Sequence, residues 1–179
     1  MTLILAAKDS EGKVWIGADS RASNGESYFD GTRKLIHQHN YVVGVSGSMR
    51  ILQIIEQHEE ALHAIESDAD MFRWCNALQL LLGDFGYGNN AGSSEPSHEG
   101  VWLLVATPTE LYVVFDNYEF HKHDRWAIGS GWEYGMGYLD ASKDDLPLSI
   151  RMSEAIVKTA GVNPTVSPDA EVVLVEGGI

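Results

Sequence analysis

The grouping of apolar runs along the chain constrains the fold more than any other feature of the sequence. TLILAA and VWIGAD, separated by the polar stretch KDSEGK, are short and rich in β-prone residues, which predicts a hairpin over residues 2–19. RKLIHQ and YVVGVSG predict a second pair of strands, and VWLLVAT and ELYVVFD predict a third. Further strands are predicted around YEFHKH, WAIG and EVVLVE. Strands joined by such short turns pair antiparallel, because parallel neighbours need long crossover connections.

Between these strands the apolar residues recur at helical spacing. One helix is predicted from Met49 through Ile65, and a second over residues 68–82. The pattern returns in WEYGMGYLDA and in PLSIRMSEAIVKTAG, where Gly161 is predicted to end the helix. The order of strands, two helices, strands, two helices and strand predicts an α+β fold. We expect a four-layer αββα sandwich, in which helix pairs cover two stacked antiparallel sheets. Without a linker or internal repeat, residues 1–179 are predicted to form one domain.

Charge and composition exclude several classes of partner. Twelve Lys and Arg against 26 Asp and Glu give a net charge of −14, which argues against binding to nucleic acid or anionic membranes. No apolar run reaches membrane-spanning length, and the first residues lack the features of a signal peptide, so a cytoplasmic location is predicted. Cys75, the only cysteine, lies in FRWCNALQLLL and is predicted to be a core residue.

Four residues near the start of the chain could form a catalytic group: Thr2, Asp19, Lys34 and Gly47. Each alone has a structural interpretation. Thr2 could be a strand residue and Asp19 could cap a turn, while Lys34 could be a surface charge and Gly47 could permit a tight turn. Met1 is readily trimmed before a small residue, and Thr2 would then carry a free α-amine as its own base, with a reference pKa of about 7.7–8.0. Lys34 would favour the neutral amine, Asp19 would orient Lys34, and the Gly47 N–H could receive an oxyanion.

These residues lie in TLILAAK, GKVWIGADSR, RKLI and GVSG, which together resemble the start of proteasome β-subunits, of HslV and of short bacterial proteasome homologues. A second segment, WAIGSGWEYGMGYLD, is similar to a later segment of the same family. The resemblance implies the fold of N-terminal nucleophile (Ntn) hydrolases. It implies Thr2 as nucleophile, Asp19 and Lys34 as the supporting pair, and Gly47 as oxyanion donor. Ser130 matches the serine that helps to hold the N-terminal amine and its water.

The resemblance implies supporting roles for four further residues. Arg21 corresponds to a structural arginine near the aspartate. Val45 and Met49 match positions near the primary specificity pocket and would favour an apolar substrate side chain. The family has an aspartate before its last strand, and Asn163 in AGVNPTVSPDAEVV stands at that position.

The family also has a serine three residues after this aspartate. Here Val166 or the adjacent Ser167 falls near the position of that serine.

The sequence therefore predicts a threonine endopeptidase acting on peptides or unfolded proteins, without a cofactor, in a homo-oligomeric ring or spiral. The sequence contains no recognisable docking motif for an ATPase partner. Two alternatives stay open. An Ntn amidase or peptide ligase would use the same residues, whereas a non-catalytic ring or scaffold subunit is favoured by Asn163 and by any retention of Met1.

Other signals in the sequence favour structural roles. The pairs His37/His39 and His121/His123 have i, i+2 spacing, but without a nearby cysteine or HExxH motif no metal site is predicted. GSGWEYG lies outside a βαβ unit and lacks dinucleotide-loop spacing. GYGNNAGSSEPSHEG is predicted to be a long loop, and the five tryptophans are interpreted as core and subunit-interface residues.

Overall fold

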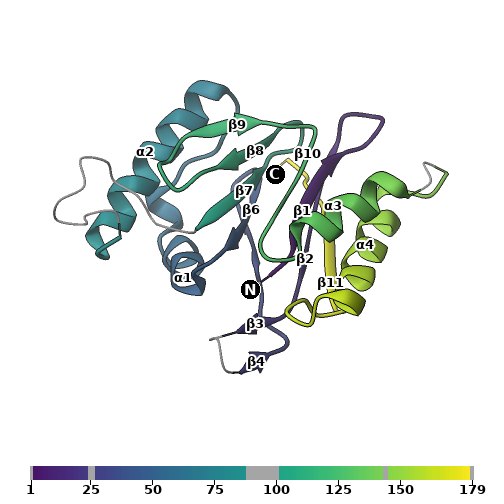
Figure 1. The fold of residues 1–179 in the computed structure, drawn as a ribbon. Coiled ribbons are helices and arrows are strands. Elements are labelled where there is room, and N and C mark those ends of the chain that lie inside the picture. The colour runs from purple at the N-terminus through teal and green to yellow at the C-terminus, as the bar shows by residue number, and fades with distance from the viewer. Residues whose placement is uncertain (1, 24–26, 88–100, 143–144, 178–179) are drawn as a thin grey trace.

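A computed structural model of the chain describes residues 2–23, 27–87, 101–142 and 145–177, and two antiparallel sheets form its centre (Figure 1). The first sheet has the strand order β10-β1-β2-β11, and the second runs β5-β6-β7-β8-β9. The strands of the first sheet are β1 (Ile4–Lys8), β2 (Val14–Asp19), β10 (Arg125–Ile128) and β11 (Ala170–Leu174). Those of the second are β5 (Leu35–Gln38), β6 (Tyr41–Ser46), β7 (Trp102–Ala106), β8 (Leu111–Val114) and β9 (Phe120–Lys122).

The predicted first hairpin is confirmed, and its turn explains its register. β1 and β2 pair from Ile4 opposite Ala18 to Lys8 opposite Val14. The Asp9 carboxylate accepts hydrogen bonds from the backbone N–H groups of Glu11 and Lys13, which fixes the KDSEGK turn. β10 and β2 flank β1 on either side, so Thr2 lies two residues before an inner strand of the sheet.

Four helices lie in two pairs, one against each sheet (Figure 1). They are α1 (Met49–Gln57), α2 (Asp68–Asp84), α3 (Trp132–Ala141) and α4 (Leu148–Val162). One hydrophobic cluster joins α1 and α2 to the five-stranded sheet, and another joins α3 and α4 to the four-stranded sheet. A third cluster contains apolar residues from both sheets, among them Ile4, Ile16, Val42 and Leu104. Cys75 is buried in the first cluster, as its sequence context predicts.

The helix expected from Met49 through Ile65 is shorter than its apolar spacing predicts. α1 ends at Gln57 and is followed by a 3₁₀ turn, η1 (Glu59–Ala61). Ile65 is buried, but from an irregular segment between η1 and α2, because the Asn40 side chain both donates to its carbonyl and accepts from its N–H. Asparagine thus supplies the hydrogen bonds that a continued helix would have made internally.

Two smaller differences concern segment ends and loops. The polar stretch after β2 holds a two-stranded ribbon, β3 (Ala22–Ser23) paired with β4 (Tyr28–Phe29), which its composition does not reveal. α4 continues one residue past Gly161. Residues 88–100 of the predicted long loop lie outside the described residues. No helix in the described part of the chain is long and apolar enough to cross a membrane.

Candidate active site

Pairing of β1 with β2 brings Thr2 and Asp19 together at one end of the hairpin. The Asp19 N–H donates to the Leu3 carbonyl, extending the strand pairing by one step. The Thr2 hydroxyl donates to Oδ1 of Asp19 at 3.0 Å, and the N–H of Leu3 donates to the same oxygen at 2.8 Å. Both Thr2 and Asp19 are buried. The separation of 17 residues in sequence is closed by an ordinary hairpin.

Lys34 joins this pair from the other sheet. It directly precedes β5, and its Nζ lies 2.5 Å from Oδ1 of Asp19. Burial of the ammonium lowers the pKa of Lys34, while the charge of Asp19 opposes that shift. A lysine with a lowered pKa exchanges protons more readily than an exposed one. Because Thr2 and Lys34 both donate to one oxygen atom, the ammonium lies beside the threonine hydroxyl.

The second oxygen of Asp19 also accepts hydrogen bonds, from two backbone N–H groups. The N–H groups of Arg21 and Ser167 donate to Oδ2 at 3.0 and 2.9 Å. Five donors therefore surround a carboxylate that is 1% exposed, which offsets the desolvation of its charge.

The guanidinium of Arg21 binds groups other than the Asp19 carboxylate. Its Nε and Nη2 atoms donate to the carboxylate of Asp30, and its Nη1 donates to the Pro164 carbonyl. Arg21 thereby ties the end of β2 to the segment that precedes β11. The charge of Arg21 lowers the pKa of Asp30 through this hydrogen-bonded pair.

The GSG turn between β10 and α3 closes over the backbone of Thr2. The Gly131 N–H donates to the Thr2 carbonyl at 3.2 Å, and the Ser130 hydroxyl approaches the same oxygen at 3.5 Å. Gly129 has a φ of +94°, and a Cβ atom there would overlap the Thr2 carbonyl. Only glycine fits this position. Ser130 is among the predicted site residues and Gly129 is not, although the AIGSG motif contains both.

Asn163 lies at the C-terminal end of α4 and reaches Thr2 only through other residues. Its side-chain N–H donates to the Ser130 carbonyl at 3.0 Å, and its Oδ1 accepts from the N–H and hydroxyl of Thr165. The Thr165 hydroxyl in turn lies 2.8 Å from the Ser130 hydroxyl. Asn163 therefore positions the turn that contacts Thr2.

Thr165 supplies the hydroxyl beside Ser130, although the residue spacing of the family does not indicate this threonine. Spacing after Asn163 suggested Val166 or Ser167, but Val166 is buried in the cluster beneath α3 and α4. The Ser167 N–H binds Asp19, and its hydroxyl accepts from Ser20. The tight turn after α4 brings Thr165 to the position instead, because Asn163 caps the backbone there.

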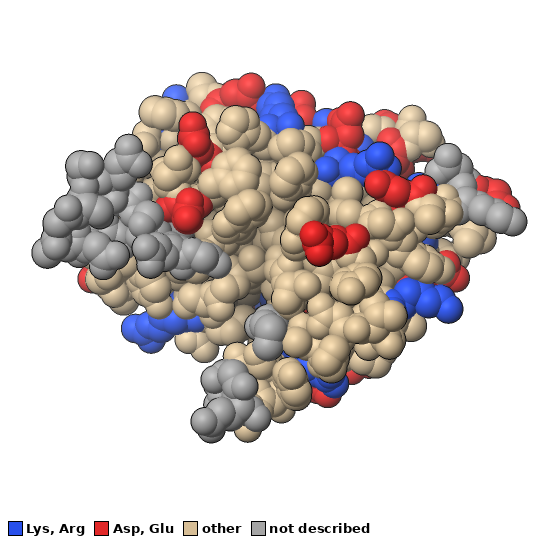
Figure 2. All heavy atoms as spheres, in the orientation of Figure 1, with Lys and Arg blue, Asp and Glu red and all other residues tan. Residues whose placement is uncertain are grey.

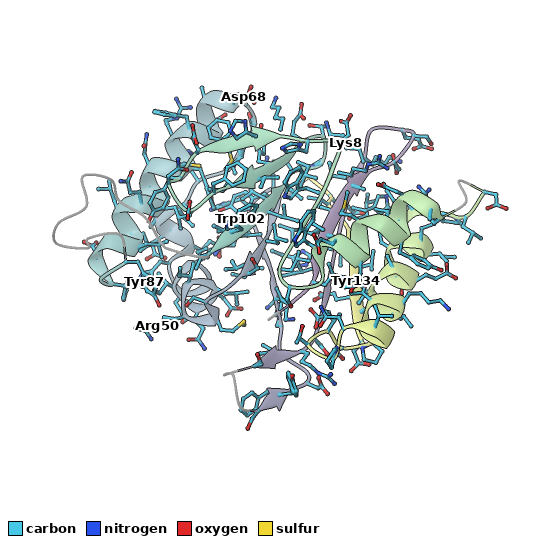
Figure 3. The ribbon with its side chains drawn as sticks, in the orientation of Figure 1. Lys8, Arg50, Asp68, Tyr87, Trp102 and Tyr134 are labelled. Carbon is cyan, nitrogen blue, oxygen red and sulfur yellow. The ribbon has the colours of Figure 1, made fainter. Side chains whose placement is uncertain are left out.

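An open cavity of about 610 Å³ lies beside Thr2. Its lining comes from the ends of β6, β7 and β10 and from the turn into α3, and consists of Thr2, Ser46, Gly47, Trp102, Trp126, Ala127, Ile128, Gly129, Ser130 and Trp132. Gly47 has a φ of +103°, which glycine tolerates and other residues avoid. Figure 3 labels Trp102, which lies between the two helix pairs. Three of the tryptophans interpreted from sequence as core or subunit-interface residues thus line this cavity.

Val45 and Met49 lie on neighbouring elements outside this lining. Val45 is buried in the cluster between the five-stranded sheet and its helices. Met49 opens α1 and packs partly buried against the same cluster. Their proposed contact with substrate stays a prediction.

The histidine pairs make contacts of a structural kind. The His39 ring bonds the Leu62 carbonyl at 2.6 Å, and the His123 ring lies 4.3 Å from that of Trp126. In the described ranges, no group of three or more His, Cys, Asp or Glu side chains is arranged to hold a metal ion.

The fold is that of the proteasome-like proteins. No protein-family model and no curated protein sequence matches the chain. Among solved structures, BPH from Thiobacillus denitrificans, a bacterial proteasome homologue, is 20% identical with a TM-score of 0.83 over 99% of both chains. HslV from Trypanosoma brucei is 15% identical with a TM-score of 0.70, over 98% of this chain and 99% of its own.

Anbu from Hyphomicrobium sp. strain MC1, in a Gly-1 mutant form, is 16% identical with a TM-score of 0.70, over 98% of this chain and 82% of its own. At these identities the likeness establishes a shared fold. The predicted resemblance to bacterial proteasome homologues and to HslV is confirmed.

Proposed function

We propose that this chain is a threonine peptidase whose nucleophile is the hydroxyl of Thr2, exposed as the N-terminal residue when Met1 is removed. Met1 itself lies outside the described residues. One observation carries the proposal: Oδ1 of Asp19 accepts hydrogen bonds from the Thr2 hydroxyl, the Leu3 N–H and the Lys34 ammonium in one buried site. A buried lysine and aspartate around an N-terminal hydroxyl are what activation of a weak nucleophile needs.

The proposed reaction is acyl transfer through an ester. The α-amine of Thr2 takes the hydroxyl proton while Oγ1 bonds to the carbonyl carbon of the substrate. The Lys34 charge stabilises the developing negative charge near Oγ1, and the N–H of Gly47 receives the oxyanion. The C–N bond then breaks, and the leaving amine takes the proton from the Thr2 ammonium. Water, deprotonated by the same amine, hydrolyses the ester and frees the hydroxyl.

Ser130 and Asn163 act in this proposal by holding the N-terminal residue. The backbone of the GSG turn already binds the Thr2 carbonyl, and Asn163 binds the backbone of that turn. Both residues would keep the amine and hydroxyl aligned with the cavity.

We also infer the architecture and setting that the family resemblance implies. The three hydrophobic clusters support a four-layer αββα order within a single domain of residues 1–179. A homo-oligomeric ring or spiral in the cytoplasm is proposed, with peptides or unfolded proteins as substrates. Exposed apolar side chains on α3 and α4, including Tyr134, Ile150, Val157 and Val162, support contacts between subunits.

Intact-mass spectrometry after incubation with a peptide epoxyketone tests the proposal, since this warhead needs both a hydroxyl and a free α-amine. We expect one adduct per chain on protein that lacks Met1, and none on Thr2→Ala. The matched control is Thr109→Ala, an exposed threonine in the turn between β7 and β8, which should keep the adduct. Equal labelling of Thr2→Ala would refute the assignment. So would protein that lacks Met1, forms no adduct and cleaves no peptide.

A further inference from the structure

Three tryptophans from separate parts of the chain meet in the wall of the cavity beside Thr2. Trp102 begins β7, Trp126 lies in β10 and Trp132 begins α3. From this convergence we infer that the cavity binds a large apolar side chain, preferably an aromatic one, from the substrate residue next to the bond that is cleaved. The inference rests on the proposed function and assigns a substrate preference to the same site.

Backbone contacts place each tryptophan close to the reacting group. Trp102 stands opposite Ser46 in the pairing of β6 with β7, directly beside the turn that holds Gly47. The N–H of Trp132 donates to the carbonyl of Gly129, the residue that packs on Thr2. Trp126 belongs to the strand that pairs with β1. Strand registers and a tight turn therefore fix the cavity wall relative to the hydroxyl, and loop mobility does not set its position.

Aromatic neighbours hold two of the indole rings in a fixed orientation. Trp102 packs edge-to-face on Phe115, with 4.9 Å between ring centroids. The ring centroid of Trp126 lies 4.3 Å from that of His123. Burial lowers the pKa of His123, which favours the uncharged imidazole beside the indole. Aromatic pairs of this kind restrict ring motion, and a wall ordered before binding loses little entropy when a ligand enters.

The chemistry of the lining selects against charge. No lysine, arginine, aspartate or glutamate is present among the described residues that line the cavity. Figure 2 shows mostly uncharged atoms over the part of this face where Trp102 lies in Figure 3, with acidic side chains on either side of it. A volume of about 610 Å³ accommodates the largest side chains together with part of the peptide backbone. An ionised side chain placed against these rings would lose hydration without gaining a partner.

Mapping of cleavage sites tests the preference in the active protein. We would digest a peptide mixture from denatured casein and identify the products by mass spectrometry. Phe, Tyr, Trp or Leu should occupy one of the two positions flanking the cleaved bond at least fivefold above their abundance. Trp102→Leu and Trp132→Ala should each lower this enrichment at least threefold. Trp15→Leu, which alters a tryptophan packed against α3 and α4, should leave it unchanged. Equal enrichment in all variants would overturn the inference.

A binding measurement keeps the inference testable if the peptidase proposal fails. In the Thr2→Ala protein the cavity wall is retained without the nucleophile. Ligand-observed NMR should show acetyl-phenylalanine amide binding at least tenfold more tightly than acetyl-lysine amide. The second change Trp102→Leu should abolish this difference, with urea midpoints confirming that both proteins are folded. Equal binding of the two amides, or no binding of either, would overturn the inference whether or not the epoxyketone labels Thr2.

Discussion

Replacement of Asp19 by asparagine should destabilise the protein strongly, because the aspartate joins the two sheets through a buried charge. Its two oxygens accept five hydrogen bonds, and the amide group of asparagine offers one oxygen together with an NH₂ that faces donors. Lys34, 2% exposed, would lose its counter-ion. Removal of one partner from a buried ion pair costs about 3–5 kcal/mol, so we expect the free energy of unfolding of Asp19→Asn to fall by this amount.

Urea denaturation followed by circular dichroism measures this change, with two companion variants. Lys34→Met should cost less than Asp19→Asn, because four of the five donors to the carboxylate remain. The double variant should cost less than the sum of the two, by about 0.5–3 kcal/mol, as coupled neighbours do. Asp30→Asn, which alters the exposed partner of Arg21, should leave the midpoint nearly unchanged. A loss below about 1 kcal/mol for Asp19→Asn would refute the reasoning.

Three further predictions use other parts of the molecule. Gly129→Ala should lower stability by more than about 1 kcal/mol and abolish epoxyketone labelling, because the added Cβ atom would overlap the Thr2 carbonyl. The control Gly137→Ala, which adds a Cβ atom in open space on α3, should do neither. The thiol of Cys75 is buried and its pKa is raised to about 12, so it should react with Ellman's reagent only after urea unfolds the protein. Reaction of the native protein at the rate of a free thiol would contradict the described core. Burial raises the pKa of Tyr41 to about 12, so the unfolded chain ionises first as pH rises from 10 to 12. Stability of roughly 3 kcal/mol, present below pH 10, is therefore lost across this window. Tyr41→Phe should flatten the fall in urea midpoint between pH 9 and 11, and an unchanged slope would count against this origin.

The part of the site that could be predicted from sequence is the part made by local structure. A hairpin with a recognisable turn places Thr2 beside Asp19, and a short motif identifies Lys34 on the next strand pair. The element order likewise follows from hydrophobic periodicity and short turns. These features depend on residues that are near each other in sequence or carried by a specific family motif.

The rest depends on geometry that spacing does not encode. Thr165 takes the place beside Ser130 because Asn163 tightens the turn after α4, which a residue count cannot reveal. The three tryptophans of the cavity come from three separate elements, so their convergence is a property of the tertiary fold. Ile65 fits helical spacing yet is buried from an irregular segment, because Asn40 supplies its backbone with hydrogen bonds.

The hydrogen bond from the N–H of Ser167 to the Asp19 carboxylate can form only late in protein synthesis. The two residues are 148 positions apart, and β11, which follows Ser167, pairs directly with β2. At a translation rate of about 5–20 residues per second, Asp19 is synthesised roughly 7–30 s before its last donor is made. During that interval the carboxylate lacks its full set of hydrogen bonds and β2 presents an unpaired edge. A nascent or truncated chain therefore holds its first strands in an incomplete environment, and the proposed active site is complete only after β11 has been added.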